Sequence, residues 1–303
     1  MKHEEMLLFK RFSSNLKTKD EYLFTLREFH NFTGKGIFNV TPEDIKSYID
    51  NLGNSNTTKR KKYHHLLSFY NFLVDDLIIN FNPVSAISPP AASKHIKMSR
   101  TLLFNNVKPF LDTLETCFSY RDYVITLIIA TTGLKVSEAT GIRWSDFIID
   151  NNQHIGLMVG PKNNRRYVRI FNFVWEKINT YRLYLNLPES YLREDYVVFF
   201  SEKNNILYKE NPGLVKPITS YWLHKVYVKA CEMLDIPLIT AKDIRHNYTM
   251  LCMKLGSSSE DIKEQLGWSS TDFIYRYNGV VELLDSPINK MVEEYYASLF
   301  AEK

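Results

Sequence analysis

Apolar residues recur at intervals of three or four along most of the chain, a pattern typical of amphipathic helices. In the first third the repeat includes Tyr22, Leu26 and Phe29 and stops at Gly34. Thr41 then offers an N-cap with proline at the first helical position. We therefore predict helices before residue 34, over residues 41–52, and in a basic and aromatic stretch for which Asn56 or Thr57 is the predicted N-cap.

A change in composition separates this helical region from the rest of the chain. Asn82 and Pro83 end the periodic pattern, and residues 88–100 then combine two prolines with small and basic residues. Such a composition indicates a semi-rigid linker. We predict an all-helical domain at residues 1–88, a linker at residues 89–100 and a second domain at residues 101–303.

The second region mixes helical periodicity with one stretch of alternation. HIGLMVG and RRYVRIF alternate around GPKNN, which predicts a β-hairpin over residues 154–171. Residues 196–206 are typical of strand and loop. Helices are predicted at residues 102–117, 121–131, 174–185, 221–234, 241–255, 259–266 and 273–277, with a short one after Gly133 and an amphipathic one within 287–300. The fold class is mainly α with a small β-hairpin or sheet.

Composition places the chain among soluble globular proteins, since 45% of its 303 residues are hydrophobic and 24% are charged. No run approaches 18 consecutive apolar residues, and the N-terminus lacks the apolar core of a secretory signal. Cys117, Cys231 and Cys252 are widely separated, which indicates neither a disulfide framework nor a zinc site. We expect a cytoplasmic protein.

The net charge of +4 is modest, but the surplus of Lys and Arg lies in the first third of the chain. It gathers at the head of the fourth predicted helix, in Lys59, Arg60, Lys61 and Lys62. Such a row suits a phosphate backbone, because each neutralised phosphate releases counterions. A solvated basic face is the alternative. The neighbouring histidines have no carboxylate or cysteine at ligand spacing, so a metal site is not expected there.

The stretch from Thr131 to Phe147, TTGLKVSEATGIRWSDF, is the most informative in the second region. Lys135 falls near the start of the short helix that follows Gly133. A cation there opposes the helix dipole unless an anion lies beside it. A DNA phosphate would supply that anion, and a solvated lysine is the alternative.

Together with KDIR, LGW and the tyrosines that follow them, this stretch resembles the tyrosine recombinase, or phage integrase, family over nearly the whole chain. The resemblance implies a helical core-binding domain followed by a catalytic domain. Family members usually carry TGLR-x-SEL where this chain has TGLKVSEA. The resemblance implies six catalytic residues. Lys135 stands in place of the usual arginine, Lys162 is the hairpin lysine one position out of register, and Lys242 and Arg245 come from KDIR. Trp268 comes from LGW, and Tyr277, nine residues later, is the implied nucleophile, with Tyr275 as an alternative.

The chemistry of DNA strand exchange explains this grouping. A tyrosine attacking a phosphodiester needs a proton donor for the leaving 5′ oxygen and fixed positive charge around the phosphorus. Guanidinium groups serve best, because each can hold two phosphate oxygens. No metal or cofactor is required, and no nucleotide-binding glycine loop is present in the sequence. Arg143, Arg165 and Arg166 are further candidate contacts to double-stranded DNA.

Lys135 keeps the charge of the usual arginine but loses its bidentate geometry. Loss of one such donor costs about 3 kcal/mol of transition-state stabilisation, whereas DNA affinity is spread over many contacts. We therefore favour a sequence-specific DNA-binding protein with impaired or lost recombination, acting as a repressor-like regulator of a phage or mobile element. The alternatives are an active recombinase that forms a 3′-phosphotyrosyl intermediate, with Lys135 compensated by Arg143 or Arg165, and an accessory architectural protein. Each of these proteins would act at the nucleoid when bound to DNA. We also expect self-association through the helix within 287–300.

Overall fold

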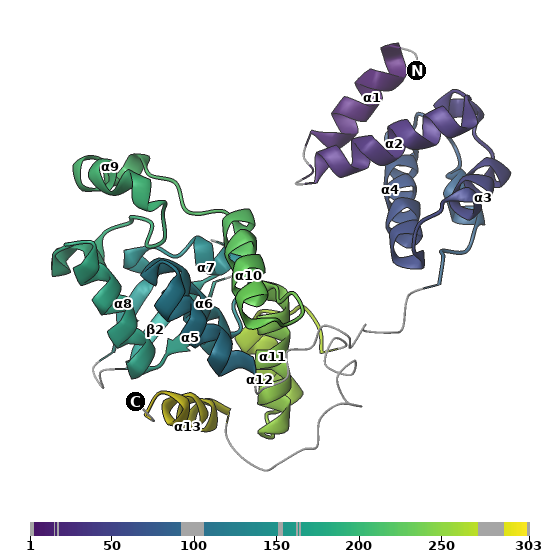
Figure 1. The fold of residues 1–303 in the computed structure, drawn as a ribbon. Coiled ribbons are helices and arrows are strands. Elements are labelled where there is room, and N and C mark those ends of the chain that lie inside the picture. The colour runs from purple at the N-terminus through teal and green to yellow at the C-terminus, as the bar shows by residue number, and fades with distance from the viewer. Residues whose placement is uncertain are drawn as a thin grey trace. The chain divides into compact units, whose positions relative to one another are not determined.

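A computed structural model of the chain describes residues 3–14, 16, 18–91, 106–150, 154–161, 163, 165–271 and 288–301. The chain divides into two compact units, residues 1–96 and residues 97–303 (Figure 1). This division falls within the segment that the sequence predicts as a linker. Among the described residues, no helix combines the length and apolar composition that crossing a membrane requires.

The first unit is helical, as predicted. Its described helices are α1 (His3–Ser13), α2 (Lys19–Thr33), α3 (Pro42–Asn51) and α4 (Asn56–Asp75), with 3-10 turns at Ile37–Asn39 and Pro83–Ala86. Thr41 caps α3 in a reciprocal capping box with Asp44. The predicted cap of α4 was wrong by one residue, because the Ser55 hydroxyl accepts the hydrogen bond from the Thr58 backbone N–H.

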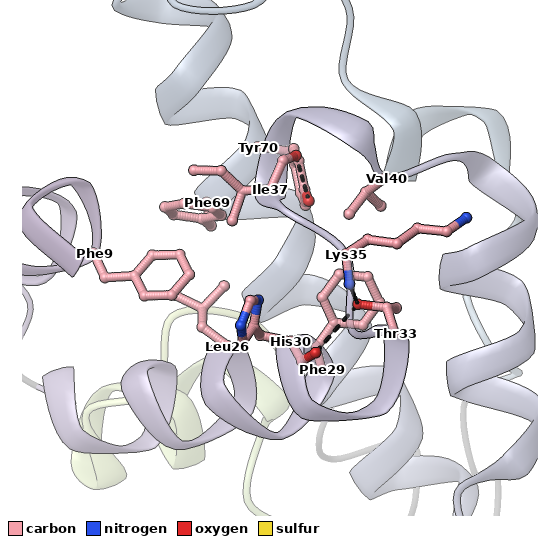
Figure 2. A pocket seen from close by; sticks show the side chains of 10 residues that line it. All are labelled: Phe9, Leu26, Phe29, His30, Thr33, Lys35, Ile37, Val40, Phe69 and Tyr70. Atoms are coloured by element: carbon pink, nitrogen blue, oxygen red, sulfur yellow. Dashed lines mark hydrogen bonds between the residues drawn. The ribbon is translucent and has the colours of Figure 1, made fainter. Parts of the chain in front are cut away.

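Aromatic side chains fill the interior of this unit. The rings of Phe9 and Phe69 meet edge to face with centroids 4.8 Å apart. Figure 2 shows these side chains around a cavity of about 10 Å³, where the Tyr70 hydroxyl donates to the Ile37 carbonyl oxygen at 3.2 Å. A cavity of that size holds about one water molecule. It is therefore a packing feature of the core and too small to be a ligand site.

The second unit is built around α6 (Tyr120–Thr132), whose residues from Arg121 to Thr132 are all buried. The other described helices of this unit are α5 (Val107–Cys117), α7 (Val136–Thr140), α8 (Asn172–Tyr184), α9 (Asn205–Glu210), α10 (Ser220–Leu234), α11 (Ala241–Lys254), α12 (Ser259–Leu266) and α13 (Ile288–Ala301). Of these, α5, α8, α11 and α13 pack against α6. Because α6 is covered on all sides, its C-terminal end is held firmly in the fold.

A small antiparallel sheet in the order β1-β2-β3 completes this unit. Its strands are β1 (Phe147–Ile149), β2 (Ile155–Val159) and β3 (Arg166–Ile170). The predicted hairpin is confirmed, with Val159 paired to Arg166. Strand β1 was not predicted from the sequence, because it is three residues long and directly follows a 3-10 turn. The strand predicted within residues 196–206 was wrong, since two isolated bridges replace it and α9 begins at Asn205.

The C-terminal helix α13 packs on its own unit, against α6 and α11 (Figure 1). Val292 and Tyr296 are buried, and the Tyr296 hydroxyl donates to the Ala130 carbonyl oxygen at 3.0 Å. Self-association through this helix stays a prediction, since these contacts already use one of its faces. The short helix predicted at residues 273–277 lies outside the described residues.

Candidate functional site

A glycine at the end of α6 brings three helices together. Gly133 adopts a left-handed conformation with φ of 68°, which favours glycine. A Cβ at this position would lie 2.5 Å from Tyr248 Cδ1 on α11 and 2.6 Å from Leu266 Cδ2 on α12. Only the absence of a side chain allows this close approach. The end of α6 therefore lies directly against α11 and α12, and the chain turns from there into α7.

Lys135 is the N-cap residue of α7, and its side chain is 51% exposed. Its backbone N–H donates to Glu138 Oε2 at 2.9 Å, and its Nζ lies 3.9 Å from Glu138 Oε1. The anion expected beside this cation is therefore supplied by the same helical turn. Glu138 was not predicted as a site residue, although an acid three residues after an N-cap is the signal of a capping box.

Glu138 is held mainly by an arginine from the sheet. Arg166 Nη1 and Nη2 donate to its two carboxylate oxygens, each at 3.0 Å. Burial disfavours the charged carboxylate, but the hydrogen bonds from Arg166 and from the Lys135 backbone outweigh burial and lower the pKa of Glu138. Glu138 is therefore ionised at neutral pH and joins α7 to β3.

Arg245 lies on α11, is only 8% exposed, and is fixed by two backbone carbonyls. Its Nη1 donates to Gly133 O at 2.6 Å and its Nη2 to Leu266 O at 2.8 Å. Its Cζ lies 5.9 Å from the centre of the Trp268 ring. The guanidinium plane is thus set by two motifs together, through Gly133 of TGLK and Leu266 of LGW.

Of the other residues implied by the resemblance, the structure describes Lys242 and Trp268. Lys242 is exposed on α11 and precedes Arg245 by three residues, which puts the two on one side of the helix. Trp268 is partly exposed and follows Gly267, the left-handed C-cap of α12. Lys162, Tyr275 and Tyr277 lie outside the described residues.

Positive charge exceeds negative charge in the cluster formed by Lys135, Arg166, Arg245 and Glu138. Lys135 Nζ and Arg245 Nη1 each lie 3.9 Å from an oxygen of Glu138, which Arg166 also binds. Three cations therefore surround one carboxylate. A surplus of fixed positive charge beside exposed surface attracts anions, and guanidinium and ammonium groups suit phosphate in particular.

A groove of about 370 Å³ adjoins the cluster, between α7 and the hairpin, with Lys135, Arg143 and Arg165 in its lining. Arg143 Nη1 lies 3.5 Å from an Asp195 carboxylate oxygen and keeps 43% of its side chain exposed. Arg165 Nη1 lies 3.6 Å from Asp146 Oδ1, and its side chain is 40% exposed. Two further guanidinium groups thus share a hollow surface with the Lys135 ammonium.

The four cations of the basic row in the first unit, residues 59–62, have different partners. Lys59 donates to the Asp50 carbonyl oxygen, Arg60 to the Pro90 carbonyl oxygen, and Lys61 forms an exposed ion pair with Glu21. Lys62 departs from the expectation of a surface cation. It is 9% exposed and its Nζ lies 2.6 Å from Glu28 Oε2, because its position faces α2. We therefore assign Lys62 to the core and keep Lys59, Arg60 and Lys61 as candidate DNA contacts.

Comparison with known proteins decides the family. Residues 100–282 match the model of the phage integrase family. The chain belongs to the phage integrase family. Tyrosine recombinase XerC of Listeria monocytogenes serotype 4b is 24% identical over 282 residues, covering 88% of each chain. Tyrosine recombinase XerC of Pediococcus pentosaceus is 24% identical over 280 residues, again covering 88% of each chain. The resemblance that the sequence motifs indicated is confirmed.

Solved structures agree with the integrase fold. The XerH site-specific recombinase bound to its difH substrate superposes with a TM-score of 0.65 at 18% identity, covering 94% of this chain and 80% of that one. A dimer of lambda integrase residues 75–356 bound to a COC' core site gives a TM-score of 0.69 at 14% identity, covering 95% of this chain and 99% of that one. At such identities the likeness establishes the two-domain fold, which confirms the predicted architecture.

Proposed function

We propose that this integrase-family protein is a site-specific tyrosine recombinase that breaks and rejoins double-stranded DNA. The observation that carries the proposal is the setting of Arg245. Its guanidinium is fixed by Gly133 O and Leu266 O, lies over Trp268, and adjoins the half-exposed Lys135. Such preorganised charge is what a phosphodiester transition state requires. The XerC relatives, which are named as recombinases, give further support.

In this proposal Tyr277 releases its phenolic proton to water and attacks the phosphorus of one strand as the phenolate. A bond forms between the tyrosyl oxygen and phosphorus, and the bond to the 5′ oxygen breaks, leaving a 3′-phosphotyrosyl link. The departing oxygen takes up a proton, for which Lys162 and Lys242 are the candidate donors. Arg245 and Lys135 stabilise the negative charge on the phosphoryl oxygens. A second strand's 5′ hydroxyl then reverses these steps and rejoins the DNA.

A regulator without strand exchange is the second candidate, and Lys135 is the observation that favours it. An ammonium group binds phosphate as a point charge and lacks the planar fork of arginine. A repressor-like role would need only DNA binding by the basic groove and by the first unit. The relatives reported above are recombinases and integrases, so we rank this candidate below the enzyme.

One assay separates the two candidates. Duplexes are first selected from a randomised pool by binding to the purified protein, and a nicked version of the selected site is then incubated with it. We expect a covalent protein–DNA band on a denaturing gel that persists in Tyr275→Phe and disappears in Tyr277→Phe. Selective binding with no covalent band would favour the regulator. Failure to select any duplex would overturn both candidates.

A further inference from the structure

Lys135 and Glu138 form a loose ion pair. They are three residues apart on one helical turn, and Lys135 Nζ lies 3.9 Å from Glu138 Oε1, beyond hydrogen-bonding distance. A lysine ammonium sits on a flexible four-carbon stem, so a small rotation would bring it onto the carboxylate. An ammonium hydrogen-bonded in that way would be less available to a phosphate. The site therefore needs a reason why Lys135 does not close onto Glu138 to hydrogen-bonding distance.

Arg166 provides that reason by occupying the carboxylate. Its two terminal nitrogens each bind one oxygen of Glu138 at 3.0 Å, and the Lys135 backbone N–H binds Oε2 at 2.9 Å. A carboxylate offers about four acceptor positions, so three are already used at hydrogen-bonding distance. A two-point arginine pair is also stronger than a single ammonium contact.

Arg166 is itself fixed on the side away from Glu138. Its Nε donates to the Gln265 carbonyl oxygen at 2.9 Å, near the end of α12. A Cβ on Gly267 would lie 2.7 Å from its Nη1, so the next turn of chain closes over the guanidinium. The side chain of Arg166 is 17% exposed, against 51% for Lys135. The half-buried arginine is committed to internal partners, and the exposed lysine is left facing solvent.

We infer that Arg166 is a positioning residue of the DNA-phosphate site, which holds Glu138 so that the Lys135 ammonium stays available for a phosphate. The inference rests on the proposed function, because it assumes that Lys135 meets DNA. It also replaces the sequence-based idea that Arg143 or Arg165 compensates for the loss of the usual arginine. Compensation acts through Arg166, which keeps the ion pair between Lys135 and Glu138 loose.

The first test measures Lys135 without DNA. Acetylation of Lys135 by limiting acetic anhydride is followed by peptide mass spectrometry in wild type, Arg166→Met and the Arg166→Met/Glu138→Gln double variant. A hydrogen bond to Glu138 would hold the amine in its ammonium form and slow its reaction, by about threefold for an exposed ion pair. We expect this slowing in Arg166→Met and recovery in the double variant. Local unfolding would have the opposite sign, because it would expose Lys135 and speed the reaction.

The second test measures DNA affinity against salt concentration, in a Tyr277→Phe background that removes cleavage. With the selected duplex as probe, loss of one phosphate contact lowers the slope of log K against log salt by about 0.9. We expect that decrease in Arg166→Met and its reversal in the double variant. Arg166→Lys, which keeps the charge but not the fork, should fall between wild type and Arg166→Met. Arg182→Met is the matched control, since Arg182 on α8 also donates to a backbone carbonyl, that of Leu187.

The outcomes separate this inference from the proposed function. If wild type binds no duplex, the proposed function fails, while acetylation still reports whether Arg166 keeps Glu138 from Lys135. If DNA is bound but the double variant loses more than Arg166→Met in both measurements, Arg166 is only a structural residue and the inference is overturned. Tryptophan fluorescence during urea unfolding checks that each variant is folded. A variant that fails this check is replaced by Gly267→Ala, whose added methyl displaces the Arg166 guanidinium and should slow acetylation of Lys135 in the same way.

Discussion

Arg245 donates a hydrogen bond to the carbonyl oxygen of Gly133 at 2.6 Å, across a sequence separation of 112 residues. The bond joins the turn that precedes Lys135 to the helix that carries the site's most buried guanidinium. It requires the end of α6 to approach α11 within contact distance. The geometry of the charged groups therefore depends on an uncharged residue, Gly133, which has no side chain to prevent this approach.

Gly133→Ala should destabilise the second unit by about 3 kcal/mol. A left-handed conformation costs an alanine about 1 kcal/mol or more, and overpacking a core adds about 1 to 3 kcal/mol. The added Cβ would meet Tyr248 and Leu266, which are buried and cannot move aside. Urea unfolding followed by tryptophan fluorescence measures this, because all four tryptophans lie in the second unit.

Gly34→Ala is the matched control for that measurement. Its φ of 62° is close to that of Gly133, but its added Cβ would meet no atom within 4 Å. We expect a loss of about 1 kcal/mol, which is conformational, measured by amide hydrogen exchange along α2. Equal losses at the two positions would show that contact with Tyr248 and Leu266 contributes nothing.

Lys135→Arg should increase the rate of covalent complex formation if the proposed recombinase is limited by charge at the phosphate. One well-placed donor is worth about 10² to 10³ in rate, and an arginine adds a second donor at the same position. We expect a gain of roughly tenfold or more, measured on the nicked duplex under single-turnover conditions. DNA affinity should change far less, because it is spread over many phosphates. An unchanged rate would mean that a single ammonium suffices at this position.

The contribution of Glu138 to stability should depend on pH in the acid range. Its pKa is lowered in the folded protein from an ordinary value near 4.5. A depressed carboxyl pKa stabilises the fold fully above the unfolded value, and this stabilisation is lost as pH falls through the folded value. Glu138→Gln should therefore cost about 2 kcal/mol at pH 7, because it removes a charged partner of Arg166. The difference from wild type should shrink below pH 4.5, and a constant difference between pH 3 and pH 7 would contradict this.

Sequence periodicity predicted most helices and the hairpin because both depend on local alternation of apolar and polar residues. It missed β1, since a strand from Phe147 to Ile149 is too short to show a period. It also missed Glu138, whose importance comes from a partner on β3, 28 residues away. Contacts between distant segments leave no periodic trace in one sequence. The motifs located Lys135, Arg245 and Trp268, but not the contacts that orient them.

The same limit explains the reassignment of Lys62. Four consecutive cations on a helix point in different directions, because successive residues are turned by about 100°. A row in the sequence is therefore never a row on one face. Lys61 points outward and Lys62 inward toward Glu28, a distinction that depends on where α2 packs. Burial of a charge with a partner is common in folded units and indicates structure as readily as function.

Neutralising the basic row should therefore give two different results within one helix. Lys61→Ala removes an exposed cation, so it should cost less than about 1 kcal/mol of stability but lower the DNA salt slope by about 0.9 if it meets a phosphate. Lys62→Ala leaves the half-buried Glu28 without its cation and should cost about 2 kcal/mol or more, with the salt slope unchanged. Amide hydrogen exchange along α4 reports the stability of the first unit, and filter binding from 50 to 200 mM salt gives the slope. A reduced slope in Lys62→Ala, with exchange unchanged, would place Lys62 on the DNA surface and reject its assignment to the core.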